Sequence, residues 1–426
     1  MELKPHVVMV PLPFQGHIKP FLCLAQLLSQ TGLYITFVNT RYNHKRFSNL
    51  SALSLQFPNL QFESISDGMP DEDDQPRSLT FDFFYGLKYQ SREHLKELIG
   101  TLSRRSENAQ SPPITCIIGD GSVSFPVDVA EELGIPVISF CCHSAHYLLA
   151  NICIPKLIED GQLPYHEEKD TNHRINIEVA GLELEGRLRL KDLPDFCVLK
   201  DVNDPAYQFF VNEALAMTRS SGVIFNTADD LEAPCLPTIA NICGRAYTIG
   251  PLHALLNSQI GHNRSQLTAS HGSLWKTKHD CMTWLDSQPS RSVLYVSFGS
   301  LVKTSSAQLL EIWNGLVDSG YSFLWAVRPD MVDEENDNGI VSFPKVLEIG
   351  PKERGYIVDW APQERVLAHD AVGGFLTHGG WNSILESILA GVPMIGWPNL
   401  GDQRVDHTEN NQDIDGGKGG VSKVSG

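Results

Sequence analysis

The stretch that decides the fold covers residues 7–38, VVMVPLPFQGHIKPFLCLAQLLSQTGLYITFV. It opens with an apolar, largely β-branched run that is typical of a strand buried on both faces. A proline-rich loop follows, and apolar residues then recur at helical spacing from Ile18 to Leu28, with Gly32 as the helix stop. Residues 34–38 form the next expected strand. The segment therefore predicts the opening of a parallel α/β sheet, with His17 at the carboxyl end of its first strand.

The same alternation returns twice along the 426-residue chain, which is longer than the roughly 250–300 residues that one core supports. It predicts two doubly wound, Rossmann-like α/β domains that face a cleft. We place an N-terminal domain at 1–250, a polar linker region at 251–288 and a second domain at 289–426, whose glycine-rich end, 404–426, is expected to be a flexible tail. Later strands are expected at 115–118, 137–140, 293–296, 323–327, 356–358, 374–376 and 394–397.

Composition excludes several classes of partner. Acidic residues exceed basic ones by 51 to 33, a net charge of −18, so nucleic acid is not expected to be the main ligand. No apolar run reaches the length of about 18 residues that a membrane helix needs, so stable membrane insertion is not expected. The nine cysteines include no C-x-x-C pair, which favours reduced thiols. We therefore expect a cytoplasmic protein, a monomer, whose partners are small molecules.

One segment carries the pattern of an anion site. A strand over 374–376 feeds the glycine-rich turn Thr377-His378-Gly379-Gly380, and a helix follows. Backbone N–H groups at such a helix start favour a phosphate, and Asn382 and Ser383 add side-chain donors. The turn is not a P-loop, because no Gly-Lys-Ser/Thr sequence follows. On this pattern alone, Asn382 and Ser383 are equally well explained as helix N-caps.

The 44 residues of 360–403 carry more than that turn. WAPQ at 360–363, HGGWNS at 378–383, GVPM at 391–394 and the final Asp402-Gln403 together resemble the signature box of plant UDP-dependent glycosyltransferases of family 1, which have the GT-B fold. The segments PFQGH (13–17), SDGMP (66–70), RLKDLP (189–194) and WLDSQP (284–289) are similar to the same family. Family members continue past the position of Gln403, so the resemblance implies a truncated, incomplete second domain.

The resemblance assigns roles within the box. Trp360 would stack on the uracil, with Ala361 at the base edge, and Gln363 and Glu386 would bind the ribose. Asp402 and Gln403 would bind the sugar, and a final glutamine resembles the pattern of glucose donors, so UDP-glucose is the expected co-substrate and no metal or other cofactor is needed. The diphosphate would be held by Ser300, His378, Asn382 and Ser383, with Trp381 beside the sugar.

His17 and Asp120 form a second constellation, since both lie at the carboxyl ends of expected strands. An imidazole with a pKa near 6.5 can accept a proton from a hydroxyl, and a carboxylate on its other nitrogen fixes the tautomer. A lone loop histidine is more often structural, but family positions match Gln15-Gly16-His17 and Asp120-Gly121. Family members usually carry serine before the aspartate where this chain has Gly119, a change from which we expect little consequence.

The implied reaction is an inverting transfer of glucose to a hydroxyl, or carboxyl, of a small lipophilic plant metabolite, giving a β-glucoside. Ser144 is the candidate acceptor residue, and the overall resemblance is closest to enzymes that act on iridoids and other terpenoids. Two alternatives stay open. One is a catalytically silent, truncated protein that binds a sugar nucleotide or an acceptor, and the other is a GT-B enzyme that uses a different nucleotide.

Overall fold

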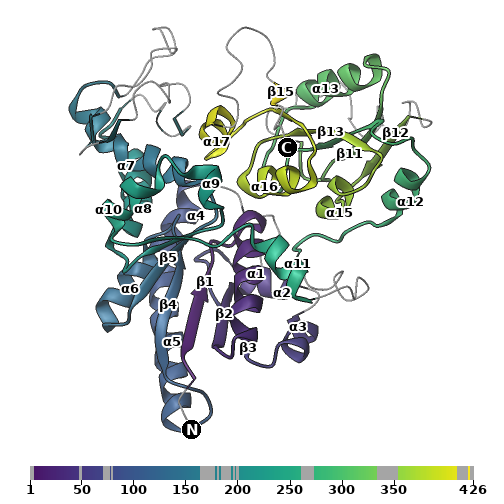
Figure 1. Ribbon diagram of the computed structural model, residues 1–426. Helices are drawn as coiled ribbons and strands as arrows, with labels where there is room; N and C mark the ends of the chain where they lie inside the picture. The colour runs from purple at the N-terminus through teal and green to yellow at the C-terminus, as the bar shows by residue number, and fades with distance from the viewer. Residues whose placement is uncertain are drawn as a thin grey trace. The chain divides into compact units, whose positions relative to one another are not determined.

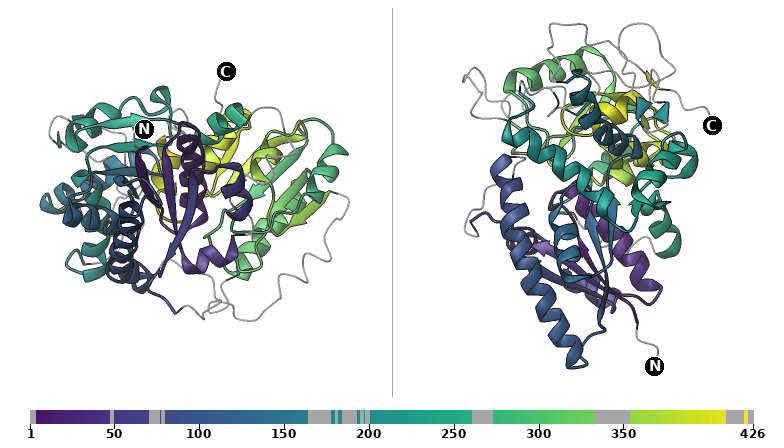
Figure 2. Two further views of the ribbon diagram at one scale, coloured as in Figure 1. Left: turned by 90° about the horizontal axis from the view of Figure 1, so that it is seen from below. Right: turned by 90° about the vertical axis from the view of Figure 1, so that its left-hand side faces the viewer.

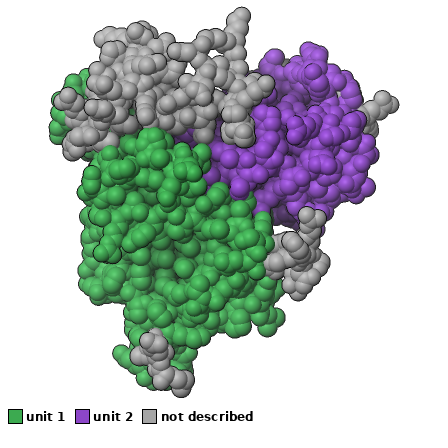
Figure 3. Space-filling view, in the orientation of Figure 1, with its two compact units in different colours: residues 1–274 green, residues 275–426 purple. Residues whose placement is uncertain are grey.

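The structure is a computed structural model, and the chain divides into two compact units, residues 1–274 and 275–426 (Figure 3). Each unit is described by itself. No helix among the described residues is both long and apolar enough to cross a bilayer. The described residues are 4–47, 50–70, 77, 80–163, 178–179, 182–183, 193–194, 197, 201–260, 273–332, 354–409 and 421–422.

The first unit is built on a parallel sheet whose seven described strands run in the order β3-β2-β1-β4-β5-β8-β9. Figure 1 labels β1 to β5 of this sheet. The chain moves outward from β1 to β3 and then returns to place β4 on the other side of β1. That reversal creates a switch point between β1 and β4, the position where open α/β sheets bind ligands. The strands are β1 (His6–Val10), β2 (Tyr34–Thr40), β3 (Leu60–Ile65), β4 (Ile114–Asp120), β5 (Val137–Cys141), β8 (Val223–Phe225) and β9 (Ala246–Thr248).

Helices connect and cover these strands. The longest continuous helical stretch is the blue rod formed by α4, a π-helical turn η1 and α5 (Figure 2). A separate two-stranded ribbon is formed by β6 (Glu178–Val179) and β7 (Leu182–Glu183). The helical elements are α1 (Gln15–Gln30), α2 (Arg41–Arg46), α3 (Leu50–Gln56), α4 (Phe81–Gly86), η1 (Leu87–Ser91), α5 (Arg92–Glu107), α6 (Phe125–Leu133), α7 (Ala145–Glu159), α8 (Pro205–Leu215), the 3-10 turn η4 (Ala216–Arg219), α9 (Asp229–Glu232), α10 (Leu236–Cys243) and α11 (Leu252–Ile260).

The core of the first unit explains the apolar pattern of the opening segment. Phe21 of α1 lies fully buried against Phe140 of β5, with ring centroids 4.8 Å apart. The stretch expected to be a linker contains α11, and its Leu252 and Leu256 are buried in this same core. The apolar residues at helical spacing within 252–256 form only a short run, and the polar residues that follow favour a linker. The sequence therefore did not predict this helix.

The second unit repeats the strand order of the first. Its sheet runs β12-β11-β10-β13-β14-β15, parallel except for the last pair, so its switch point lies between β10 and β13. The predicted α/β class with two Rossmann-like domains is thereby confirmed. The elements are α12 (Asp280–Asp286), β10 (Val293–Ser297), α13 (Ser306–Asp318), β11 (Ser322–Ala326), β12 (Gly355–Val358), α15 (Gln363–Leu367), β13 (Val372–Thr377), α16 (Trp381–Ala390), β14 (Met394–Gly396), α17 (Gln403–Glu409) and β15 (Val421–Ser422).

The end of the chain differs from the expected flexible tail. Residues 404–409 continue α17, which begins at Gln403, and β15 pairs with β14. Val405 and Asp406 are fully buried. A single buried valine among polar residues gives no apolar periodicity, so the sequence pattern missed a helix that tertiary packing supports.

Candidate active site

The switch point of the first unit brings His17 and Asp120 together. His17 lies in the first turn of α1, directly after the β1 loop, and Asp120 is the last residue of β4. His17 Nδ1 lies 2.9 Å from Asp120 Oδ2. The carboxylate is fully buried, whereas the imidazole keeps 21% of its side-chain surface exposed.

Asp120 is held by more than the histidine. Its Oδ2 also accepts the backbone N–H of Leu12 at 2.9 Å, and its Oδ1 accepts that of Ser122 at 2.9 Å. Burial opposes ionisation of this carboxyl group, but the charge of His17 and the three hydrogen bonds together outweigh it and lower the pKa of Asp120. Asp120 is therefore a fixed anion at the base of the site.

This arrangement determines which nitrogen of His17 can act as a base. An ionised carboxylate only accepts hydrogen bonds, so the Nδ1 atom carries the proton. Nε2 then bears the lone pair that can take a proton from a bound hydroxyl. Cys142 packs beside the same residue, with its Sγ 3.8 Å from the His17 carbonyl oxygen.

In the second unit, the loops after β10 and β13 touch each other at the corresponding edge of the sheet. Gly299 has a φ of +70°, and a Cβ placed there would lie 2.4 Å from His378 Nε2, so the two loops could not approach with a side chain at 299. Desolvation and the nearby Arg328 guanidinium lower the pKa of His378 to about 4. His378 is therefore neutral near pH 7 and offers hydrogen bonds rather than a charge.

A second polar cluster joins α15 to α16. Gln363 Nε2 donates to Glu386 Oε2 at 2.9 Å and to Ser383 Oγ at 3.0 Å, while its Oε1 accepts the Tyr295 hydroxyl at 3.2 Å. Glu386 and Ser383 are buried at 4% and 6% exposure. Three of the residues expected to bind the nucleotide are thus held in direct contact.

The remaining residues expected to bind the UDP-sugar lie in loops and at helix starts of the second unit. Trp360 is partly buried and stacks on Trp275, with ring centroids 5.7 Å apart at 24°. Gln403 Oε1 accepts the backbone N–H groups of Asn399 and Leu400, so this side chain also shapes its own loop. Ser300, Asn382 and Asp402 are partly buried in the loops or at the helix start, while Ala361 and Trp381 are buried at 5% and 3% exposure.

Arg328 is a functional candidate that the sequence pattern did not reveal. It follows β11, is 3% exposed, and donates to the carbonyl oxygens of Gly299 and Val302 as well as to Asp330. Its guanidinium therefore anchors the loop that includes Ser300. An arginine just after a buried strand is the one local signal that could have identified it.

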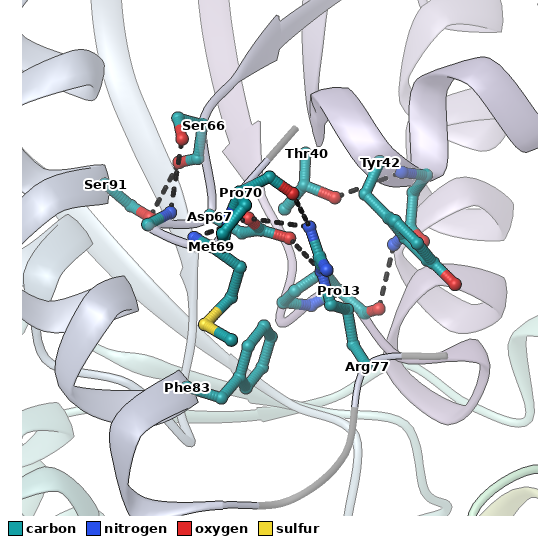
Figure 4. Close-up of polar contacts among 12 residues, drawn as sticks. Pro13, Thr40, Tyr42, Ser66, Asp67, Met69, Pro70, Arg77, Phe83 and Ser91 are labelled. Atoms are coloured by element: carbon teal, nitrogen blue, oxygen red, sulfur yellow. Dashed lines mark hydrogen bonds and ion pairs between the residues drawn. The ribbon is translucent and has the colours of Figure 1, made fainter. Parts of the chain in front are cut away.

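The structure also defines the surroundings of Ser144 and of the family-like segment SDGMP in the first unit. Ser144, the candidate acceptor residue, is 1% exposed and caps α7 by accepting the Tyr147 N–H at 3.0 Å. Figure 4 shows the loop after β3, where Arg77 donates to Asp67 at 2.9 Å close to the loop of Pro13. Asn43 of α2 donates to the Pro13 carbonyl at 2.8 Å, which ties this helix to the loop before His17. Of the family-like segment RLKDLP, residues 189–192 lie outside the described residues.

Within the described part of the chain, two groups of side chains have metal-ligating atoms within 4.8 Å of one another. One is His17, Asp120 and Cys142, and the other is His146, Glu232 and Cys235. In the second group, Glu232 accepts the N–H groups of Ala145 and His146, which identifies it as a cap of α7.

Comparison with known proteins agrees with this geometry. Residues 266–422 match the family model "UDP-glucoronosyl and UDP-glucosyl transferase", and residues 4–177 match the model of a glycosyltransferase N-terminal domain. Mogroside I-A1 synthase of Siraitia grosvenorii is 45% identical over 94% of this chain and 75% of its own length. The 7-deoxyloganetic acid glucosyltransferase of Catharanthus roseus is 44% identical over 95% of this chain and 83% of its own length.

Solved structures show the same likeness. Os79 from O. sativa in complex with UDP superposes with a TM-score of 0.71 at 28% identity, covering 94% of this chain and 83% of that one. Phytolacca americana UGT2, complexed with UDP-2fluoro-glucose and pterostilbene, gives a TM-score of 0.71 at 29% identity, covering 97% and 84%.

Proposed function

This chain belongs to the plant family 1 UDP-glycosyltransferases, and from that premise we propose that it transfers glucose from UDP-glucose to a hydroxyl of a small lipophilic metabolite. The observation that carries the proposal is the 2.9 Å contact between His17 and the buried Asp120. Relatives named for a terpenoid glycoside and for an iridoid acid favour an acceptor of terpenoid or iridoid type.

The proposed reaction is a single displacement with inversion. His17 Nε2 takes the proton of the acceptor hydroxyl as its oxygen attacks the anomeric carbon of the glucose. The bond from that carbon to the UDP oxygen breaks, and the nucleotide leaves as UDP. Asp120 stabilises the imidazolium that forms, so the proton transfer needs no other charged partner.

The donor is proposed to bind the edge of the second unit. Gln363 and Glu386 would bind the ribose, Trp360 and Ala361 the uracil, and Asp402 and Gln403 the glucose. Ser300, His378, Asn382 and Ser383 would hold the diphosphate at the start of α16, where the helix dipole favours an anion, with Trp381 beside the sugar. We propose that no metal takes part, and undiminished turnover in excess EDTA would agree with that.

His17→Ala tests the proposal. We expect kcat to fall by about 10²–10⁴-fold, because the general base is lost. The affinity for UDP should stay within about twofold, because the residues proposed to bind UDP all belong to the second unit. Turnover is measured with UDP-glucose on a panel of terpenoid and phenolic aglycones, and UDP affinity by calorimetry. Wild-type turnover in the variant would remove His17 from the mechanism.

The alternative of a catalytically silent protein finds no support among the relatives, which include a named glucosyltransferase at 44% identity. A donor other than a uridine nucleotide is also disfavoured, since solved relatives hold UDP or a UDP-sugar. The monomeric state and the cytoplasmic location remain predictions from the sequence, to be checked by light scattering and by cell fractionation.

A further inference from the structure

A buried carboxylate outside the proposed dyad holds the turn that follows Asp120. Glu213 of α8 is 3% exposed. Its Oε2 accepts the backbone N–H of Ser124 at 2.7 Å, and its Oε1 accepts the Ser124 hydroxyl at 2.8 Å. Lys88 Nζ lies 2.5 Å from the same Oε1. Three residues that are far apart in the sequence therefore form one polar cluster, which we call the Glu213 cluster.

The Glu213 cluster acts on a short and defined piece of chain. Ser124 is the N-cap residue of α6, but its own side chain makes no capping bond, so Glu213 supplies the acceptor at this helix start. Ser122, two residues earlier, donates its N–H to Asp120 Oδ1 at 2.9 Å. The turn after Asp120 is therefore held at two points. Ser122 is bonded to the carboxylate that faces His17, and Ser124 is bonded to Glu213.

Lys88 reaches Glu213 from an unusual backbone. It lies in η1, the π-helical turn between α4 and α5, and such turns occur frequently at functional sites. Its ammonium group also lies 5.1 Å from the ring centroid of Phe209 on α8. A buried carboxylate without a counter-ion is costly, and Lys88 supplies a counter-ion to Glu213.

We infer that Glu213, paired with Lys88, is a positioning residue that fixes the turn from Ser122 to Ser124 and thereby keeps Asp120 hydrogen-bonded to His17. The inference rests on the roles proposed for His17 and Asp120. A displacement of about 1 Å in a catalytic group can cost on the order of 10²-fold in rate, so a support of this kind has a measurable effect.

Steady-state kinetics separate positioning from stability. Glu213→Leu removes both acceptors of Ser124, and we expect kcat to fall roughly tenfold with the KM for UDP-glucose within about twofold. The double variant Lys88→Met/Glu213→Gln removes both charges but keeps an oxygen that can accept from Ser124, so its kcat should lie within about threefold of wild type. Each rate is divided by the concentration of UDP-binding sites measured by calorimetry, so that unfolded protein does not lower the kcat.

Arg219→Leu is the matched control, because Arg219 also binds α6, but through the partly exposed side chains of Asp128 and Glu131 and not through Ser124. It should lower Tm without changing kcat. If Glu213→Leu keeps the wild-type kcat, or raises the KM for UDP-glucose as much as it lowers kcat, the inference is overturned. Should Glu213→Leu not fold, Lys88→Met is measured instead, with the same direction expected and the same contradicting result.

A spectroscopic readout makes the test independent of turnover. The Nδ1–H proton of His17 in its bond to Asp120 should give a downfield proton resonance, assigned by its absence in His17→Gln. We expect Glu213→Leu to shift or broaden it and Arg219→Leu to leave it in place. An unchanged resonance in Glu213→Leu contradicts the inference, whether or not the protein transfers glucose. If the unsubstituted chain transfers no glucose, the proposed function is contradicted instead.

Discussion

Two histidines of this chain suit different roles because their surroundings differ. His17 faces a buried anion, Asp120, and keeps part of its ring exposed, which suits the proton-accepting role proposed for it. His378 is surrounded by Gly299, Gly380 and the Arg328 guanidinium, and its pKa is lowered to about 4. It is held neutral, so that it can donate or accept a hydrogen bond without a change of charge.

The lowered pKa of His378 predicts a pH-dependent stability. Below about pH 6.5 His378 is protonated in the unfolded chain but stays neutral in the folded chain until the pH nears 4. The free energy of unfolding should therefore fall as the pH drops from 6.5 to about 4. Asp120 acts in a lower window, because its lowered pKa contributes stability that is lost only below its ordinary value of 3.8. In His378→Gln the slope between pH 6.5 and 4 should flatten, as measured by urea unfolding at a series of pH values. His94 of α5, whose Nδ1 lies 2.8 Å from the Gln90 carbonyl in an exposed contact, is the control. The same slope in His378→Gln and in His94→Gln would contradict the assignment.

Single residues also mark the limit of prediction from sequence. His17 and Asp120 could be identified because each follows an apolar strand and matches a family position. Glu213 and Arg328 could not, because their roles arise from contacts with segments distant in the sequence, 89 residues away for Glu213 and Ser124 and 29 for Arg328 and Gly299. No local spacing encodes such contacts.

Strand β4 and helix α6 pack closely where the chain departs from its family. A Cβ placed at Gly119 would lie 2.7 Å from the Cβ of Pro126, which is nearer than such atoms approach. Any side chain at position 119, including the usual serine, would therefore clash with Pro126. The glycine has a structural consequence here, contrary to the expectation that this change would matter little.

Gly119→Ala should lower the free energy of unfolding by about 1–3 kcal/mol, because either the strand or the helix must shift. Gly315→Ala on α13 is the matched control, since nothing lies within 4 Å of its added Cβ, and it should stabilise the protein by roughly 0.5–1 kcal/mol. Chemical denaturation of both variants gives the comparison. Equal changes in the two would show that the contact with Pro126 does not matter.

Prediction of the elements worked best where the pattern was long and apolar. The alternation of strands and helices was visible from residues 7–38 and repeated after residue 293, because buried parallel strands are continuous apolar runs. Helices α11 and α17 were missed, since each is short and buries few apolar residues, Leu252 and Leu256 in α11 and Val405 in α17.

The two units carry separate parts of the proposed site. The residues proposed for chemistry belong to residues 1–274, and those proposed for the nucleotide belong to residues 275–426. Substitutions in the two units should therefore affect different kinetic constants.

Glu386→Ala is the test in the second unit. We expect UDP to bind about 10–100-fold more weakly, because a buried acceptor held by Gln363 is lost. Glu311→Ala, an exposed acidic residue on α13, should leave UDP binding unchanged. Calorimetric titration with UDP measures both. Undiminished affinity in Glu386→Ala would remove this carboxylate from the nucleotide site.

The repeated strand order has a consequence for how such a protein can diversify. Each half presents its loops at the reversal point of its own sheet, so mutations in one set of loops leave the hydrogen-bonded ladder of the other untouched. With the roles proposed for the two units, substitutions in the first could change which acceptor is glycosylated while the donor site of the second is kept, so selection can act on the two units separately.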